Sequence, residues 1–472
     1  MPRFGTNGIR EVVGETLTPA FARTFASAVA ATAPPSSPEH PILVGRDGRT
    51  SSEALSAIVR SVLTLAGHFV VDSGVLPTPA HQYLLPRWGA VFGVVVTASH
   101  NPPEFNGFKC FGADGLEATP AVEGAIETAM ERAVDPSAPF DRIGASTARD
   151  DGARTYSDGI ERSVAADEIR RRRFTVVLDC GNGASVVSSP YLLRRLGCRV
   201  VTLNGHLDGT FPGHLSEPTE ANLVDLARAV PALGADLGIA HDGDADRAVF
   251  IDRTGQYVPG EKLLALLARE AVIARKGGVV VTPVTTSSIV EEAVAANGGS
   301  VVYTRVGSPS VCREMRDRRA VFGGEENGGL IFPTFQLARD GLRSAAGVLE
   351  LLARTGRDLG ELVRELPERA LVKEKVACPA TLRERVISEL EATFGRGSDR
   401  VVTLDGVKAY FGATWVLVRP SGTEPLVRVF AEAHDRSTAQ SLANRAVAAV
   451  KETVERLASR STAPTGDGRH SA

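Results

Sequence analysis

The chain has 472 residues, of which 43% are hydrophobic and 23% charged, and its formal net charge is −3 at pH 7. This length excludes a single hydrophobic core and predicts roughly three or four domains. The slightly acidic balance implies no basic face, which argues against nucleic-acid binding. No apolar run approaches the roughly 20 residues that span a bilayer, and the first residues lack the apolar core of a signal peptide. We therefore expect a cytoplasmic globular protein with no membrane contact.

Strand and helix signals alternate through the first three-quarters of the chain. Thr18 precedes Pro19, so that a capping hydroxyl and a first-turn proline introduce a helix expected over 20–30. The elements that follow are a strand at 41–45, a helix at 51–66, and strands at 69–72, 91–96 and 174–179. Alternation of this kind predicts α/β layers with parallel or mixed sheets.

The last part of the chain has a different pattern. Residues 407–418 and 426–433 are expected to form paired strands, and a long amphipathic helix is expected over 438–457. Composition shifts elsewhere indicate the remaining boundaries. We expect α/β domains at 1–150, 151–252 and 253–368, a smaller α+β domain at 369–458, and a disordered tail at 459–472.

The five cysteines are scattered, and none has CxxC spacing. Such cysteines are typical of reduced, mostly buried side chains in a cytoplasmic protein. They are Cys110, Cys180, Cys198, Cys312 and Cys378.

An apolar strand that ends in a polar loop occurs three times. The three loops begin near Ser99, Asp242 and Glu325. If three similar domains pack around one cleft, these loops could converge there, which is a hypothesis that rests on a faint repeat.

Ser99 lies in the run Thr-Ala-Ser-His-Asn-Pro, directly after the apolar strand at 91–96. A hydroxyl that directly follows a buried strand and precedes an Asn-Pro break in the chain is held in a fixed position. Such a position suits a nucleophile or a carrier of a phosphoryl group.

The run Asp-Gly-Asp-Ala-Asp-Arg at 242–247 is the strongest isolated signal. Asp242, Asp244 and Asp246, spaced by small residues in an extended loop, can direct three carboxylates at one point. Hard oxygen donors suit Mg²⁺, which leaves open positions for a phosphate. Arg247 would offset the remaining negative charge and hold phosphate oxygens.

Two further glycine-containing loops carry polar side chains. In the run Gly-Gly-Glu-Glu-Asn-Gly-Gly at 323–329, Glu325 and Asn327 have acceptors and donors that suit sugar hydroxyls. The run Arg-Pro-Ser-Gly-Thr-Glu-Pro at 419–425 is a turn between strands and also a concave site for a phosphate dianion. No P-loop is present, and Gly-Asn-Gly at 181–183 lacks the third glycine of a dinucleotide site.

These four segments, in this order, resemble the α-D-phosphohexomutase superfamily. In that family the TASHNP loop carries the phosphoserine, the DGDxDR loop binds Mg²⁺, the GE-x-[SN]-G loop contacts the sugar and the RPSGTEP loop binds the substrate phosphate. The opening run Phe-Gly-Thr-Asn-Gly-Ile-Arg at 4–10 is similar to that of phosphoglucosamine mutases and archaeal relatives. The resemblance implies four domains around a central cleft, three of them α/β and the last smaller.

The resemblance also implies a role for each matching residue. Ser99 would carry the phosphoryl group, with His100 and Asn101 shaping its loop. The implied metal ligands are a phosphoserine oxygen of Ser99 with Asp242, Asp244 and Asp246. The cations around the phosphoryl group would be Arg10, Lys109 and Arg247, with Lys109 also suited to proton transfer. The substrate-binding residues would be Glu325, Asn327, Arg305, Gly307, Arg419, Ser421, Gly422, Thr423 and Arg428.

The implied activity is an isomerase that moves phosphate between C1 and C6 of a hexose, through a phosphoserine and a hexose 1,6-bisphosphate. Glucosamine phosphate is the favoured substrate, and phosphomannomutase or phosphoglucomutase activity is the alternative. A Mg²⁺ phosphatase with an aspartyl nucleophile and a non-enzymatic sugar-phosphate sensor are the other hypotheses. The protein would be a monomer or a homodimer.

Three positions depart from the family pattern. Gly329 stands where many relatives have histidine, which leaves the general acid or base open. Ser308 stands where an acidic residue or histidine is common, and Glu11 replaces a frequent glycine. These departures affect the choice of sugar and leave the phosphoryl chemistry unchanged.

Overall fold

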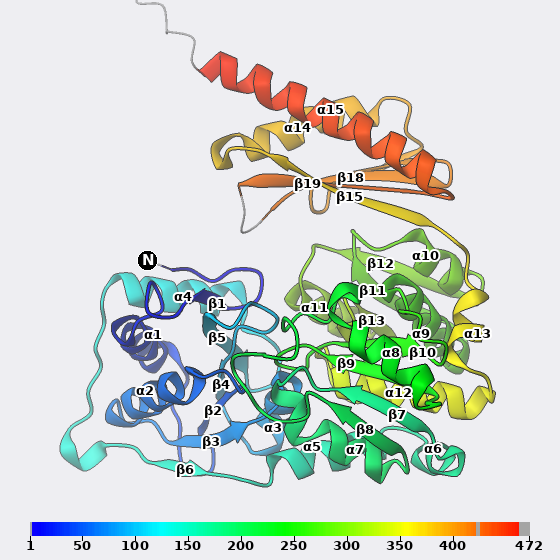
Figure 1. The fold of residues 1–472 in the computed structure, drawn as a ribbon. Helices are drawn as coiled ribbons and strands as arrows, with labels where there is room; N and C mark the ends of the chain where they lie inside the picture. Colours follow the sequence, from blue (N-terminus) through cyan, green and yellow to red (C-terminus); the bar gives the residue numbers. More distant parts are fainter. Residues whose placement is uncertain (1, 422–424, 462–472) are drawn as a thin grey trace, which may run out of the picture. The chain divides into compact units, whose positions relative to one another are not determined.

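The computed structural model describes residues 2–421 and 425–461. The chain divides into two compact units. The first comprises residues 1–282, 290–302 and 307–366, and the second comprises residues 283–289, 303–306 and 367–472. No helix in the described ranges is long and apolar enough to cross a membrane. The described residues form four sheets, three of them α/β in character and the last antiparallel (Figure 1).

The first sheet has six strands and mixed direction. Its elements are β1 (Ile9–Val12), α1 (Pro19–Thr32), β2 (Ile42–Arg46), α2 (Ser52–Leu65), β3 (Val70–Val75), α3 (Thr78–Arg87), β4 (Phe92–Val96), β5 (Phe105–Gly112), α4 (Pro120–Glu131) and β6 (Ser146–Ala148). The strand order is β1-β5-β4-β2-β3-β6, and β5 runs antiparallel to both of its neighbours. Helix α1 begins as expected, because the Thr18 hydroxyl accepts a hydrogen bond from the amide of Phe21.

Alternate residues of these strands face a core that is covered by α1, α2 and α4. Ile42 and Val44 of β2 and Val94 and Val96 of β4 are fully buried in that core. The two-residue period of a strand places them on one face. Complete burial of β4 makes the end of this strand a rigid support for the loop that contains Ser99.

The second sheet has four strands in the order β10-β9-β7-β8. Its elements are α5 (Gly152–Arg162), α6 (Ala166–Arg172), β7 (Thr175–Asp179), α7 (Ser189–Arg195), β8 (Arg199–Leu203), α8 (Val224–Ala232), β9 (Leu237–His241) and β10 (Ala248–Asp252). Strand β7 pairs in parallel with β8 and β9, whereas β9 and β10 form an antiparallel hairpin. The turn of that hairpin contains the three aspartates.

The third sheet has the order β12-β11-β13-β14. Its elements are α9 (Gly260–Arg275), β11 (Gly278–Pro283), α10 (Ser288–Ala295), β12 (Gly299–Thr304), α11 (Ser308–Arg318), β13 (Phe322–Gly324), β14 (Leu330–Ile331), α12 (Gly341–Thr355) and α13 (Leu359–Arg364). Strands β13 and β14 are antiparallel and enclose the loop with Glu325 and Asn327.

The fourth sheet is antiparallel throughout and has the order β15-β19-β18-β17-β16. Its elements are β15 (Ala370–Ala377), α14 (Arg383–Gly395), β16 (Arg400–Val402), β17 (Val407–Phe411), β18 (Thr414–Pro420), β19 (Leu426–Ala433) and α15 (Arg436–Ser461). The single strand expected over 407–418 is two strands, because Gly412 takes a φ of +59° and turns the chain back at that point. Residues 462–472 of the expected tail lie outside the described part of the chain.

The five cysteines are free and buried, as their spacing predicted. Burial raises the pKa of the Cys198 thiol and that of the Cys180 thiol to about 12. Both groups therefore behave as small apolar side chains at neutral pH.

Candidate active site

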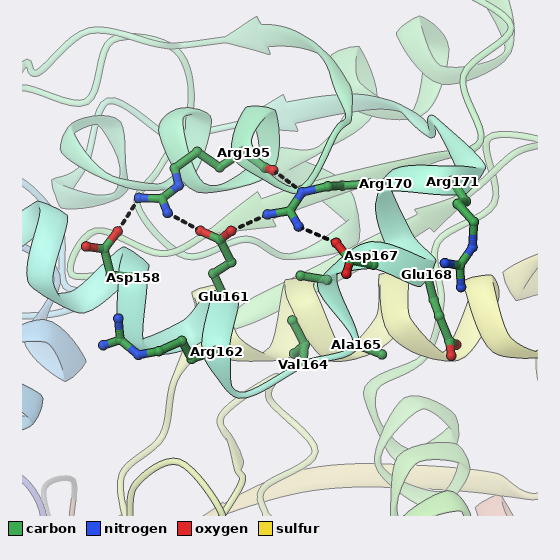
Figure 2. A pocket seen from close by; sticks show the side chains of 11 residues that line it. Asp158, Glu161, Arg162, Val164, Ala165, Asp167, Glu168, Arg170, Arg171 and Arg195 are labelled. Carbon is green, nitrogen blue, oxygen red and sulfur yellow. Dashed lines mark hydrogen bonds and ion pairs between the residues drawn. The ribbon is translucent and has the colours of Figure 1, made fainter.

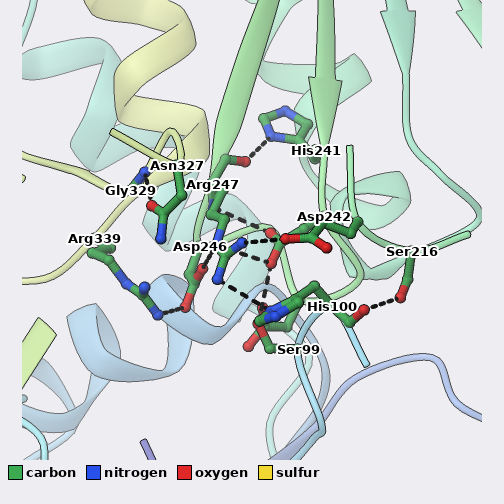
Figure 3. Close-up of polar contacts among 12 residues, drawn as sticks. Ser99, His100, Ser216, His241, Asp242, Asp246, Arg247, Asn327, Gly329 and Arg339 are labelled. Carbon is green, nitrogen blue, oxygen red and sulfur yellow. Dashed lines mark hydrogen bonds and ion pairs between the residues drawn. The ribbon is translucent and has the colours of Figure 1, made fainter. Parts of the chain in front are cut away.

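Ser99 follows β4 and has an unusual backbone conformation. Its φ is +52°, which is uncommon for a residue with a Cβ atom. The Thr97 hydroxyl oxygen accepts a hydrogen bond from the Ser99 amide at 2.9 Å. The Ser99 hydroxyl lies 3.1 Å from Oδ2 of Asp242 and 3.3 Å from Nδ1 of His100 (Figure 3). A loop of the first sheet therefore meets a loop of the second, and these are two of the three loops expected to converge.

The aspartate loop is a tight turn rather than the extended loop expected from the sequence. Ala245 has a φ of +56°, and its amide donates to the carbonyl of Asp242 at 3.0 Å. This turn closes the β9–β10 hairpin and directs the three carboxylates inward. One oxygen from each of Asp242, Asp244 and Asp246 lies within 4.8 Å of the others.

The donor set of this turn fits a hard divalent cation. Both Asp244 Oδ1 and Asp246 Oδ1 are buried, and neither has a hydrogen-bond donor within the described part of the chain. Buried carboxylate oxygens without a hydrogen bond are unfavourable unless a bound cation satisfies them. The other oxygen of Asp244 accepts hydrogen bonds from Thr78 and Lys109, each at 2.7 Å. Carboxylate oxygens such as these two are the ligands that Mg²⁺ prefers.

Cationic side chains surround this cluster. The Lys109 ammonium, 2% exposed, lies 2.7 Å from Asp244 and 3.5 Å from Asp246. Arg247 lies within 3.9 Å of Asp242 and 3.7 Å of Asp246. Arg10 donates to the side-chain oxygen of Asn101 at 3.0 Å, and burial lowers its pKa.

The carboxylates of the turn differ in their tendency to ionise. Burial, together with repulsion from Asp246 and Asp244, raises the pKa of Asp242 well above its ordinary value. Burial acts in the same direction on Asp244, but the Lys109 ammonium outweighs it and holds the pKa of Asp244 below its ordinary value. A bound cation would favour the ionised form of all three side chains.

His100 is neutral in this environment. Burial, followed by the charges of Arg247 and Arg10, lowers the pKa of His100 to about 2. Arg247 Nη2 donates to His100 Nδ1 at 3.1 Å. An arginine has no acceptor, so Nδ1 carries no proton and the imidazole proton lies on Nε2. His100 Nδ1 thus acts as an acceptor that orients the Arg247 guanidinium.

The third loop joins the same cluster through an arginine that no sequence pattern indicated. Arg339 donates to Oδ2 of Asp246 at 2.5 Å and to Oε2 of Glu325 at 2.9 Å. The other oxygen of Glu325 accepts from the Gly307 amide at 3.3 Å. Asn327 Oδ1 accepts from the amide of Gly329, so this side chain also shapes its own turn. Loops from all three α/β sheets therefore meet within the first unit.

Two more acidic side chains were missed by sequence reasoning. Glu217 lies 3.4 Å from Nη1 of Arg247. Glu117 accepts from the Ser308 hydroxyl at 2.9 and 3.0 Å, and burial raises its pKa. Glu117 and Glu217 stand outside any recognisable motif, and only the packing of loops brings them to the cluster.

The remaining predicted residues belong to the second unit. Arg419 on β18 lies opposite Arg428 on β19. Asp405 pairs with Arg419 at 3.0 Å and accepts from the Val306 amide at 3.1 Å, which brings the exposed Arg305 near this end of the sheet. The Ser421 amide donates to the carbonyl of Leu426 at 3.0 Å. The predicted Gly422 and Thr423 lie outside the described residues.

A depression of about 480 Å³ beside α5–α7 contains none of the predicted site residues (Figure 2). Its charges are paired with one another: Arg195 contacts Asp158 and Glu161, and Arg170 contacts Glu161 and Asp167. This mutual pairing leaves the depression without an excess of either charge, and the chemistry-bearing residues lie elsewhere.

Comparison with known proteins shows one family along the chain. Models of the phosphoglucomutase/phosphomannomutase α/β/α domains I, II and III match residues 1–136, 154–255 and 259–370, and the model of the C-terminal domain matches residues 369–449.

Curated relatives match over nearly the whole chain. A phosphoglucomutase/phosphomannomutase of Thermococcus kodakarensis is 39% identical over 438 residues, covering 93% of this chain and 96% of the relative. A probable phosphoglucosamine mutase of Methanopyrus kandleri is 40% identical over 457 residues, covering 96% and 99%. The crystal structure of a family protein from Burkholderia thailandensis has a TM-score of 0.83 at 28% identity, covering 95% of this chain and 97% of that one.

Proposed function

Because the chain belongs to the phosphoglucomutase/phosphomannomutase family, we propose that it interconverts hexose 6-phosphate and hexose 1-phosphate through a phosphorylated Ser99. One observation carries the proposal: the Ser99 hydroxyl lies 3.1 Å from the aspartate turn, inside a ring of arginine and lysine side chains. Phosphoryl transfer depends mainly on alignment and charge neutralisation, and this arrangement supplies both.

In the first transfer, the bond between phosphorus and Ser99 Oγ breaks and a bond forms between phosphorus and O1 of hexose 6-phosphate. The proton of the sugar hydroxyl leaves to a base, and Ser99 regains a proton. The product is a hexose 1,6-bisphosphate. In the second transfer, the 6-phosphoryl group passes to Ser99, which releases hexose 1-phosphate and restores the phosphoserine.

Mg²⁺, held by Asp242, Asp244 and Asp246 with a phosphoserine oxygen, would neutralise charge on the transferring group. Arg247 and Arg10 would hold the equatorial phosphoryl oxygens. Gly329 has no side chain with which to move a proton, and His100 is neutral with Nδ1 facing Arg247. Lys109 and Arg10 are therefore our candidates for the proton transfer.

The sugar must turn over between the two transfers, so a second set of residues has to bind whichever phosphate is not reacting. We assign this role to Arg419, Ser421, Gly422, Thr423 and Arg428. Glu325 and Asn327 would contact the sugar hydroxyls, together with the segment from Arg305 to Gly307. Within the second unit, this assignment is supported by the strand register, which places Arg419 of β18 directly opposite Arg428 of β19.

Glucosamine phosphate is our preferred substrate, because the Methanopyrus kandleri relative and the opening sequence motif both point to it. The name of the Thermococcus kodakarensis relative supports glucose and mannose phosphates as the alternative.

The test is a coupled assay of the purified protein with Mg²⁺ and a trace of glucose 1,6-bisphosphate. Glucosamine 6-phosphate, mannose 1-phosphate and glucose 1-phosphate are compared as substrates. Turnover that is lost in Ser99→Ala supports the mutase, and the ranking of rates identifies the sugar. Phosphate labelling that survives in Ser99→Ala but is lost in Asp242→Asn would instead indicate an aspartyl phosphatase. Binding of a sugar phosphate without turnover would indicate a sensor.

A further inference from the structure

Arg49 lies just after β2 and is 3% exposed. Its guanidinium donates to backbone carbonyls of the segment that begins with Ser99. Nη2 donates to the carbonyls of Ser99 at 2.9 Å and Asn101 at 2.6 Å. Nη1 donates to those of Pro102 at 2.7 Å and Phe105 at 2.9 Å. One side chain therefore holds four carbonyl groups between Ser99 and the first residue of β5.

Asp47 connects Arg49 to the other side of Ser99. It forms an ion pair with Arg49 Nε at 3.2 Å and accepts from the Thr97 hydroxyl at 2.7 Å. The Thr97 oxygen in turn accepts from the Ser99 amide. Asp47 and Arg49 thus fix the peptide groups on both sides of the Ser99 Cα atom.

The loops that follow β8 and β9 of the second sheet contact the same segment. The Ser216 hydroxyl lies 2.8 Å from the carbonyl of His100 and 2.9 Å from that of Asn101. The Arg49 guanidinium lies over the ring of Phe211, with its Cζ atom 5.0 Å from the ring centroid. A Cβ atom at Gly243 would lie 2.6 Å from the Ser99 carbonyl, so the aspartate turn passes directly over it.

We propose that Arg49 is the positioning residue that holds Ser99 in its left-handed conformation and directs its hydroxyl, with the phosphoryl group it carries, at the aspartate turn. A residue with a Cβ atom keeps a left-handed backbone conformation only where contacts with the surrounding structure hold it there. Arginine presents donors in a rigid planar fork, which the point charge of lysine lacks. A misplacement of about 1 Å lowers the rate of an aligned reaction about 100-fold. This inference rests on the proposed mutase function.

The test compares Arg49→Lys with Arg60→Lys. Arg60 is in the same α/β domain, on α2, and it pairs with Asp72 at 2.7 Å and Glu53 at 3.1 Å, away from the Ser99 loop. We expect Arg49→Lys to lower kcat about 100-fold while the substrate KM changes less than about threefold. Arg60→Lys should leave both values unchanged.

The second measurement does not depend on turnover. In hydrogen–deuterium exchange without substrate, Arg49→Lys should speed exchange of amides in peptides that span 98–106 at least about tenfold, and amides of β7–β9 should stay as in the wild type. Ser216→Ala, which removes two hydrogen bonds to the same loop, should give a smaller change in the same peptides and serves if Arg49→Lys does not fold. Unchanged exchange at 98–106 in both variants, or a uniform increase over the first unit, would overturn the proposal. If the wild-type protein shows no turnover, the proposed mutase function is refuted. The hydrogen–deuterium exchange result then decides by itself whether Arg49 holds the Ser99 segment.

Discussion

Arg339 offers the sharpest energetic test of the cluster. Its guanidinium bridges Asp246 and Glu325, and the three side chains are 6%, 4% and 9% exposed. Removing one partner of a buried ion pair costs about 3–5 kcal/mol, because the remaining charge stays buried without compensation. Arg339→Met should therefore lower the free energy of unfolding of the first unit by about 3–5 kcal/mol.

A double-mutant cycle separates the bridge from general disruption. Glu325→Gln leaves Asp246 to pair with Arg339 and should cost only about 1–3 kcal/mol. Arg339→Met leaves the carboxylates of Asp246 and Glu325 buried without their cation, whereas the double variant leaves only that of Asp246. We therefore expect the combined loss to fall short of the sum of the single losses by about 1–3 kcal/mol.

The assay is urea unfolding followed by tryptophan fluorescence. The two tryptophans, Trp88 and Trp415, belong to different units, so a Trp415→Phe background lets Trp88 report on the first unit alone. A loss under about 1 kcal/mol at pH 7, or strict additivity in the cycle, would refute the described bridge.

Three further predictions concern charge, burial and space. Lys109→Met should lower kcat about 100-fold or more. The same variant should bind Mn²⁺ more tightly in calorimetry, because the ammonium no longer neutralises two of the three aspartates. Weaker Mn²⁺ binding would contradict the contacts described. Burial lowers the pKa of His81 and that of His241 to about 4, so the unfolded chain binds more protons between about pH 4 and 6.5. Stability is therefore lost as pH falls through this range, by about 2 kcal/mol for each histidine at pH 5, and urea titrations at pH 7 and 5 in single His→Asn variants measure it. Gly243→Ala places a Cβ atom 2.6 Å from the Ser99 carbonyl, so turnover should fall about 100-fold. Helical content measured by circular dichroism should stay unchanged. A variant that turns over as fast as the wild type would show that the aspartate turn and the Ser99 loop are not in contact.

Local sequence was sufficient for the features that depend on neighbours along the chain. The helix beginning at Thr18-Pro19 and the buried strand before Ser99 follow from capping and from an apolar run. The order of the four motif loops was also enough to indicate the family. Within the last domain the sequence failed at Gly412, because an apolar run does not show where a hairpin reverses until the pairing of β17 with β18 is known.

The assembly of the cluster was decided by tertiary structure. Ser99 and Asp242 are 143 positions apart, and their contact depends on how two sheets pack. Arg339 and Arg49 lie in no motif that we recognised, and each acts through partners from distant loops or from backbone carbonyls. The sequence by itself determined which chemical groups each loop carries, because that is a local property. Only the packed fold decided which of those groups meet, which oxygens remain unpaired and which histidine nitrogen carries the proton, because these depend on burial and on neighbours contributed by other domains.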